Sequence, residues 1–75
     1  MKIIVLHDRF SNEPIIVRIA AINSLMRKKD REINEEYSEV LVGAVFYVVK
    51  EHIDVIMKKI KTAKQIRENK DADTN

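Results

Sequence analysis

Short runs of β-branched and aromatic residues alternate with polar segments through the first fifty residues. Runs of this length, bounded by turn-forming residues, predict strands. Pro14 opens the second run, where a missing N–H donor costs little. The single glycine, Gly43, lies between the fourth and fifth runs, where a tight hairpin needs a residue that accepts positive φ. We expect a bend at Ala20 and Ala21, with a short helix within residues 20–36 as an open alternative. The expected strands are residues 3–6, 14–19, 22–27, 37–42 and 45–49.

The pattern changes after the fifth run. From Ile53 onward the apolar residues recur at the spacing of one helix face, at positions 53, 56, 57, 60 and 63. We therefore expect an amphipathic helix over residues 51–66, with Met57 and, on a strand face, Met26 filling the core. Residues 67–75 have almost nothing apolar to bury and are expected to be disordered.

These elements predict one small α+β domain over residues 1–66. Its sheet is expected to be a bent antiparallel β-meander of about five short strands, barrel-like if it curls on itself. One C-terminal amphipathic helix packs across that sheet. With 75 residues the chain is near the lower end of what folds unaided, and it leaves little room for a deep substrate cleft.

The first and fifth runs are nearly continuous in apolar residues. A strand with one face in water should alternate, so these runs suggest burial on both faces. One helix cannot cover both sides of a sheet, so the chain should either curl into a barrel or pack against another copy. On this basis we expect a noncatalytic protein-interaction or assembly module, an accessory subunit that is homo-oligomeric or binds another protein. The residues expected at the self-association surface are Ile4, Leu6, Val45, Tyr47 and Val49.

Composition argues against several classes of function. The chain has no cysteine, which excludes disulfides and thiolate chemistry, and one glycine cannot build a phosphate-binding loop. Its serines lie in no nucleophile elbow, and His7 and His52 lack the spacing of metal ligands. We expect no enzyme activity, catalytic residue, metal or cofactor. The amino terminus does not resemble a signal peptide and no window suggests a membrane span, so a soluble, cytoplasmic protein is expected.

The positive charge is unevenly distributed along the chain, which leaves a second interpretation of its function open. The net charge is +2, but residues 50–67 carry six Lys or Arg against two acids. A nucleic-acid-associated protein could contact phosphates through the segment 27–31, displayed on a loop, and through the lysine face of the helix. Acidic neighbours such as Asp30 and Glu32 weaken that field, and a solvated turn is the plainer reading. The phosphate-binding residues in this alternative are Arg27, Lys28, Lys29, Arg31, Lys58 and Lys61.

The order of features is similar to that of the small FlbD-like family, which includes swarming-motility proteins. The resemblance covers about residues 2–60. It is carried by the pattern Ile15-x-Val17-x-x-x-x-Ile22-x-x-Leu25, by Gly43, and by Tyr47-Val48-Val49-Lys50-Glu51 entering the helix. The chain departs from the family in its long segment after the first strand and in Arg18, where an asparagine is usual. The resemblance implies a small noncatalytic accessory protein of bacterial or phage origin, either tied to motility complexes or with another role.

Overall fold

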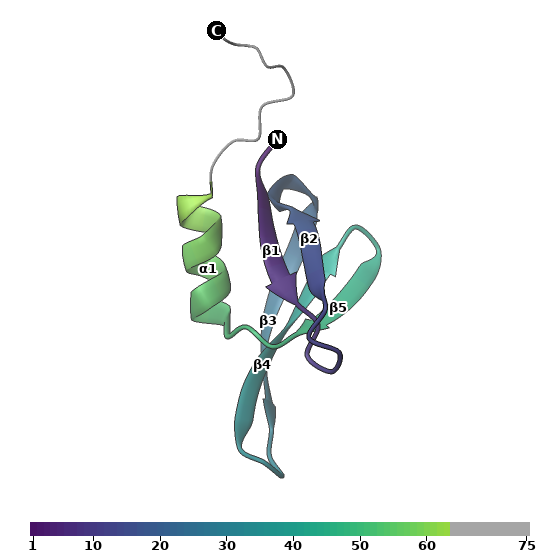
Figure 1. The fold of residues 1–75 in the computed structure, drawn as a ribbon, viewed down its shortest axis with the longest axis vertical. Coiled ribbons are helices and arrows are strands. Elements are labelled where there is room, and N and C mark those ends of the chain that lie inside the picture. The colour runs from purple at the N-terminus through teal and green to yellow at the C-terminus, as the bar shows by residue number, and fades with distance from the viewer. Residues whose placement is uncertain (64–75) are drawn as a thin grey trace, which may run out of the picture.

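The computed structural model describes residues 1–63, so the expected helix residues 64–66 and the tail 67–75 lie outside the described part. Within it, five antiparallel strands and one C-terminal α-helix confirm the α+β class (Figure 1). The strands form two sheets, β1-β2 and β3-β4-β5. The elements are β1 (Ile3–His7), β2 (Pro14–Arg18), a 3₁₀ turn (Ile19–Ala21), β3 (Ile22–Asp30), β4 (Glu35–Val42), β5 (Val45–Val49) and α1 (Ile53–Thr62).

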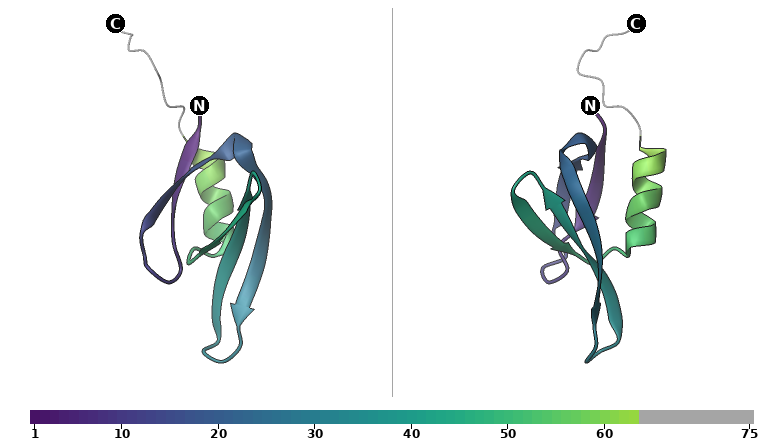
Figure 2. Two further views of the ribbon diagram at one scale, coloured as in Figure 1. Left: turned by 90° about the vertical axis from the view of Figure 1, so that its right-hand side faces the viewer. Right: turned by 180° about the vertical axis from the view of Figure 1, so that it is seen from behind.

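The expected bend at Ala20 and Ala21 is the 3₁₀ turn that carries the chain from one sheet to the other. Its Ile19 N–H donates to the Lys2 carbonyl at 3.0 Å, and its Ala21 carbonyl accepts from Gly43 N–H at 3.0 Å. The turn is therefore tied to both sheets. Figure 2 shows the β1–β2 hairpin and the three-stranded sheet diverging from it.

Among residues 1–63, three residues in the left-handed region lie in turns. Gly43 has φ +60, as the hairpin between β4 and β5 predicts. Asn12 and Asn34 have φ values of 63 and 56, a conformation that asparagine tolerates better than most residues. The turn at Asn34 allows β3 and β4 to stay paired as far as Asp30 and Glu35. The charged segment after Met26, expected as a loop, is therefore mostly strand.

The far ends of β1 and β5 join the two sheets a second time. Asp8 forms an isolated antiparallel bridge with Val49. Beside it, Arg9 N–H donates to the Val48 carbonyl at 2.9 Å, and Lys50 N–H donates to the His7 carbonyl at 3.0 Å. The two sheets are thus linked at both ends, and the space between them becomes the core.

Side chains from both sheets and from the helix fill that core. On β1 the burial alternates, with Ile4 and Leu6 pointing inward and Val5 outward at 38% exposure. The helix lies against β1 and β3 (Figure 1) and contributes the fully buried Ile56. Met57, expected in the core, is 55% exposed. The buried hydrophobic cluster consists of Ile4, Leu6, Val17, Val40, Val49 and Ile56.

Candidate interaction surface

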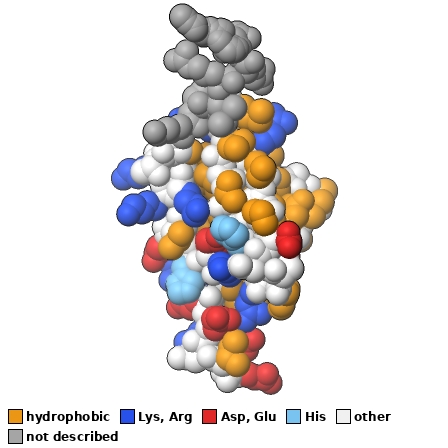
Figure 3. All heavy atoms as spheres, viewed as in Figure 1, with side chains coloured by type: hydrophobic (Ala, Val, Ile, Leu, Met, Phe, Trp, Pro, Cys, Tyr) orange, Lys and Arg blue, Asp and Glu red, His pale blue; other side chains and the backbone are white. Residues whose placement is uncertain are grey.

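The outer face of the β1–β2 hairpin carries exposed apolar side chains at its centre. Val5 and Ile16 are direct cross-strand partners and are 38% and 69% exposed. Figure 3 shows hydrophobic side chains gathered over β1 and β2, and a second group at the β4–β5 hairpin. That second group contains Val45 and Phe46, which are 51% and 57% exposed. Apolar residues paired on one sheet face in this way are a candidate contact surface.

The residues expected at a self-association surface are divided between the core and the exterior. Ile4, Leu6 and Val49 are buried within the single chain, so they are unavailable to a partner and their place in that surface is corrected. Their apolar runs are explained by the second sheet and the helix, which cover one face of each strand. Val45 is exposed and Tyr47 is half-buried against the core.

Sequence reasoning missed Ile16, although the signal was present. Val17 belongs to the apolar triplet Ile15-Ile16-Val17 in β2. In a structure of two packed layers, one face of each sheet must point to solvent. Because successive strand residues alternate between faces, burial of Val17 places Ile16 outside. Which parity faces inward depends on packing between the sheets, and the triplet alone could not decide it.

The phase of the β1–β2 ladder is fixed by the hydrogen bonds at its two ends. Residues that exchange backbone hydrogen bonds alternate with residues that do not in an antiparallel pair. At one end Ile19 N–H donates to the Lys2 carbonyl, and at the other Asp8 N–H donates to the Glu13 carbonyl at 2.9 Å. Both bonds join an even-numbered residue on the β1 side of the hairpin to an odd-numbered residue on the β2 side.

The backbone N–H and C=O groups of successive β2 residues therefore point toward opposite edges of the strand. The N–H and C=O groups of Ile15 and Val17 face β1, whereas those of Ile16 and Arg18 face the other edge of β2. Within residues 1–63 no strand pairs with that edge. In Figure 2, β2 forms the outline of the molecule on the left of the first view. Pro14, at the start of the strand, has no N–H to offer there.

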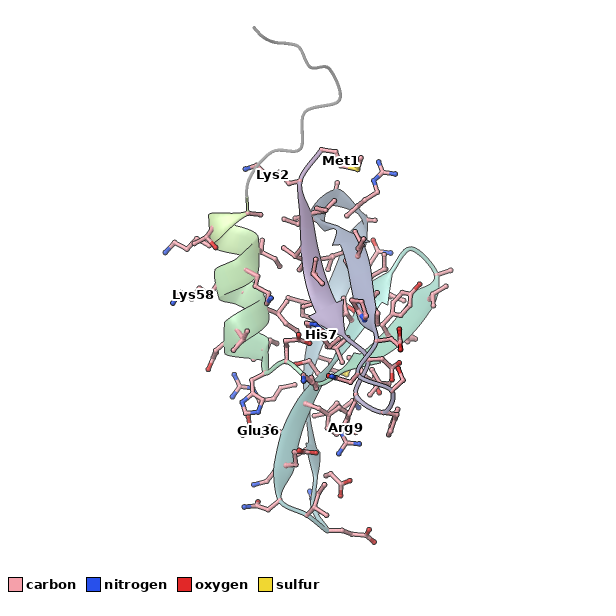
Figure 4. The ribbon with its side chains drawn as sticks, viewed as in Figure 1. Met1, Lys2, His7, Arg9, Glu36 and Lys58 are labelled. Carbon is pink, nitrogen blue, oxygen red and sulfur yellow. The ribbon has the colours of Figure 1, made fainter. Side chains whose placement is uncertain are left out.

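A hydrogen-bonded cluster holds the end of β1 against the junction between β5 and α1. The His7 amide donates to Glu51 Oε1 at 2.9 Å, and the His7 ring Nδ1 lies 2.7 Å from Glu51 Oε2 (His7 is labelled in Figure 4). The side chain of Glu51 is only 9% exposed. The fully buried Ser38 hydroxyl donates to the Glu51 carbonyl at 2.7 Å.

The electrostatics of this cluster favour an ionised Glu51. Burial by itself raises the pKa of Glu51. Hydrogen bonds from the His7 ring and amide, then a hydrogen bond from the Glu51 backbone and the electrostatic attraction of His7, together outweigh burial and hold that pKa below its ordinary value. The Ser38 hydroxyl is bonded to a backbone carbonyl and the His7 ring to a carboxylate. The arrangement therefore pairs no serine with a histidine base, and its role is to join β1 to the strand–helix junction.

A second cluster holds the loop after β1 against the β3–β4 hairpin. The Arg9 guanidinium lies 4.2 Å from the centre of the Tyr37 ring, which is within cation–π distance. Its Nη2 also contacts Asp30 Oδ2 at 3.3 Å and Glu35 Oε1 at 3.1 Å. Figure 4 labels Arg9 at this position between the loop and the hairpin. Two of the acids near the basic segment are thus engaged by Arg9.

Asp8 organises the same loop from within. Its Oδ1 accepts hydrogen bonds from the Ser11 and Phe10 amides at 2.9 and 2.8 Å. These two bonds, with that from Ser11 the larger, hold the pKa of Asp8 below its ordinary value. The side chain is therefore used in shaping the turn that ends at Asn12 and leads into β2.

The basic residues do not form the phosphate-binding loop that the sequence suggested. Arg27, Lys28 and Lys29 lie within β3, where neighbouring side chains point to opposite faces. Arg27 contacts Asp54, in the first turn of α1, at 3.6 Å. Arg31 is exposed beyond the end of β3. On the helix, Lys58 and Lys61 are exposed, and Lys58 points away from the sheets in Figure 4.

The remaining candidate groups form no larger constellation in the described residues. No three His, Asp or Glu side chains within residues 1–63 are placed to hold a metal ion. His52 is exposed at the N-terminal end of α1 and caps the helix with no side-chain hydrogen bond. In the same part of the chain no helix has the length and apolar character needed to cross a membrane. Comparisons with known protein families, with curated proteins and with solved structures find no match.

Proposed function

We propose that this chain is a noncatalytic assembly module, an accessory subunit that associates with itself. The observation that carries the proposal is the exposed Val5–Ile16 pair beside the open edge of β2. An apolar pair on an outer sheet face is poorly solvated, and an unpaired edge presents N–H and C=O groups that can pair with another strand. A second copy of the chain can pair with that edge and shield part of the apolar surface beside it.

The burial of apolar side chains gives an upper estimate of their contribution to the free energy of association. Fully burying a Val or Ile side chain contributes about 1.5–3 kcal/mol, and both residues here are already partly covered. Bringing two molecules together costs about 4–15 kcal/mol. Even complete burial of Val5 and Ile16 in both copies would therefore come only near the lower end of that cost. Association is expected to be reversible, and backbone hydrogen bonds at the edge would have to add to it.

The proposal includes a relationship with FlbD-like proteins. Part of that resemblance is the segment ending in Lys50-Glu51 before the helix. In this chain Glu51 has a structural task, because it binds the end of β1 through His7. A glutamate at this point is thus compatible with an accessory protein in which this residue stabilises the fold and takes part in no reaction.

Sedimentation equilibrium of the full chain over a wide concentration range tests self-association. We expect the mean mass to rise from that of a monomer toward that of a dimer. Because apolar burial depends little on ionic strength, the rise should persist when salt is increased, which distinguishes it from charge-driven contact. A monomer mass at every concentration would contradict the proposal.

A further inference from the structure

We propose that two copies pair through their β2 strands, antiparallel and centred on Ile16, to form one continuous four-stranded sheet β1–β2–β2–β1. This inference rests on the proposed function and names the surface that self-association uses. The occupant of the open β2 edge is a second copy of the same edge, related to the first by a two-fold axis.

The backbone of β2 presents a pattern that is complementary to itself. The N–H and C=O of Ile16 both point to the open edge, so two copies centred on this residue exchange two hydrogen bonds there. In the same register Arg18 faces Pro14 of the second copy. Each Arg18 N–H then donates to a Pro14 carbonyl, while Pro14 requires no acceptor because it has no N–H.

The exposed side chains align in the same register. Ile16 lies opposite Ile16 of the second copy, and Val5 is its cross-strand neighbour within each chain. The paired sheet therefore carries an unbroken row Val5–Ile16–Ile16–Val5 on its outer face. Cross-strand contacts between β-branched residues are favourable pairs in antiparallel sheets. The two Ile16 side chains thus cover each other in part without any rearrangement of the fold, while the outer face of the row still points to solvent.

Charge selects the antiparallel arrangement over a parallel one. Parallel pairing would place the exposed Arg18 side chains of the two copies next to each other, where like charges repel. Antiparallel pairing brings each Arg18 to the end of the second strand that carries the exposed Glu13. The longer edge strand β3 is a poorer candidate, because Lys28 and Lys29 give it the charged character that discourages edge pairing.

Disulfide trapping tests this geometry, since the chain has no cysteine of its own. Ile16→Cys places two thiols opposite each other at the two-fold axis, and cross-strand partners about 5.5 Å apart between Cα atoms are within disulfide range. Phe46→Cys is the matched control, an exposed apolar residue on the β4–β5 hairpin. Under a glutathione redox buffer we expect disulfide-linked dimers for I16C and mainly monomers for F46C. Equal cross-linking of both variants would overturn the inference.

Sedimentation of two lysine variants separates this inference from the proposed function. Ile16→Lys puts two like charges at the axis and should raise the dimer dissociation constant by about tenfold or more, whereas Phe46→Lys should leave it unchanged. If the wild type dimerises and I16K dimerises equally well, pairing through β2 is wrong and self-association stands. If the wild type itself remains a monomer, self-association is wrong as well. Circular dichroism melting of each variant checks that the fold is retained.

Discussion

Replacing Leu6 by alanine is expected to lower the free energy of unfolding by about 2–5 kcal/mol, the usual cost of a leucine-sized cavity in a packed core. Leu6 is completely buried and belongs to the cluster shared by both sheets and α1. A domain of this size has only about 5–15 kcal/mol of stability, and small domains fall at the low end. The variant should therefore be close to its unfolding transition at 37 °C. Urea unfolding followed by circular dichroism measures the change.

The matched control is the neighbouring residue on the same strand. Val5 points to solvent and is 38% exposed, so Val5→Ala should cost less than about 1 kcal/mol, near the range of ordinary surface substitutions. Equal losses for Leu6→Ala and Val5→Ala would contradict the inward and outward assignment of β1. That assignment also underlies the exposed row proposed for self-association.

Replacing Glu51 by glutamine is expected to destabilise the fold by about 1–3 kcal/mol at neutral pH, because charge-assisted hydrogen bonds in a largely buried site are weakened. Glu51 accepts from both the amide and the ring of His7. Glu32→Gln, at an exposed carboxylate in the β3–β4 turn, is the control and should be neutral. Urea unfolding at pH 7 gives the comparison.

The pH dependence of the same two proteins follows from the lowered pKa of Glu51. A carboxyl whose pKa is lower in the folded chain than in the unfolded chain contributes stability above its ordinary value, here 4.5, and loses it as pH falls through the folded value. The difference in unfolding free energy between wild type and Glu51→Gln should therefore shrink below pH 4.5. A difference that stays constant, or grows, on acidification would show that Glu51 is not held ionised by His7.

The strands were largely predictable because their signals are local. Residues 45–49 were expected as a strand and are β5, and Gly43 was expected at a hairpin with positive φ, which it has. The helix begins at Ile53 instead of residue 51, and Glu51, which precedes it, contacts His7, 44 residues away along the chain. No local pattern carries that information.

The surface was less predictable than the strands, for a related reason. A continuous apolar run such as 3–6 indicates burial but does not tell which parity faces the core, and the second sheet decides it. Ile4 and Leu6 were therefore expected at a contact with another copy, although they form the core of one copy. Ile16, whose side chain is the exposed one, was not selected. The basic segment after Met26 was expected as a loop because a run of charged residues gives no strand pattern. It nevertheless continues β3, and the turn at Asn34 lets it pair with β4.

Amide hydrogen exchange of the wild-type chain, compared between dilute and concentrated samples, reports on pairing through β2 residue by residue. We expect the Ile16 and Arg18 amides, which point to the open edge, to exchange quickly when the chain is dilute and to become protected when it is concentrated. The amides of Ile15 and Val17, which point to β1, should be protected at both concentrations. Rapid exchange at Ile16 and Arg18 in the concentrated sample, with Ile15 and Val17 still protected, would contradict pairing through β2.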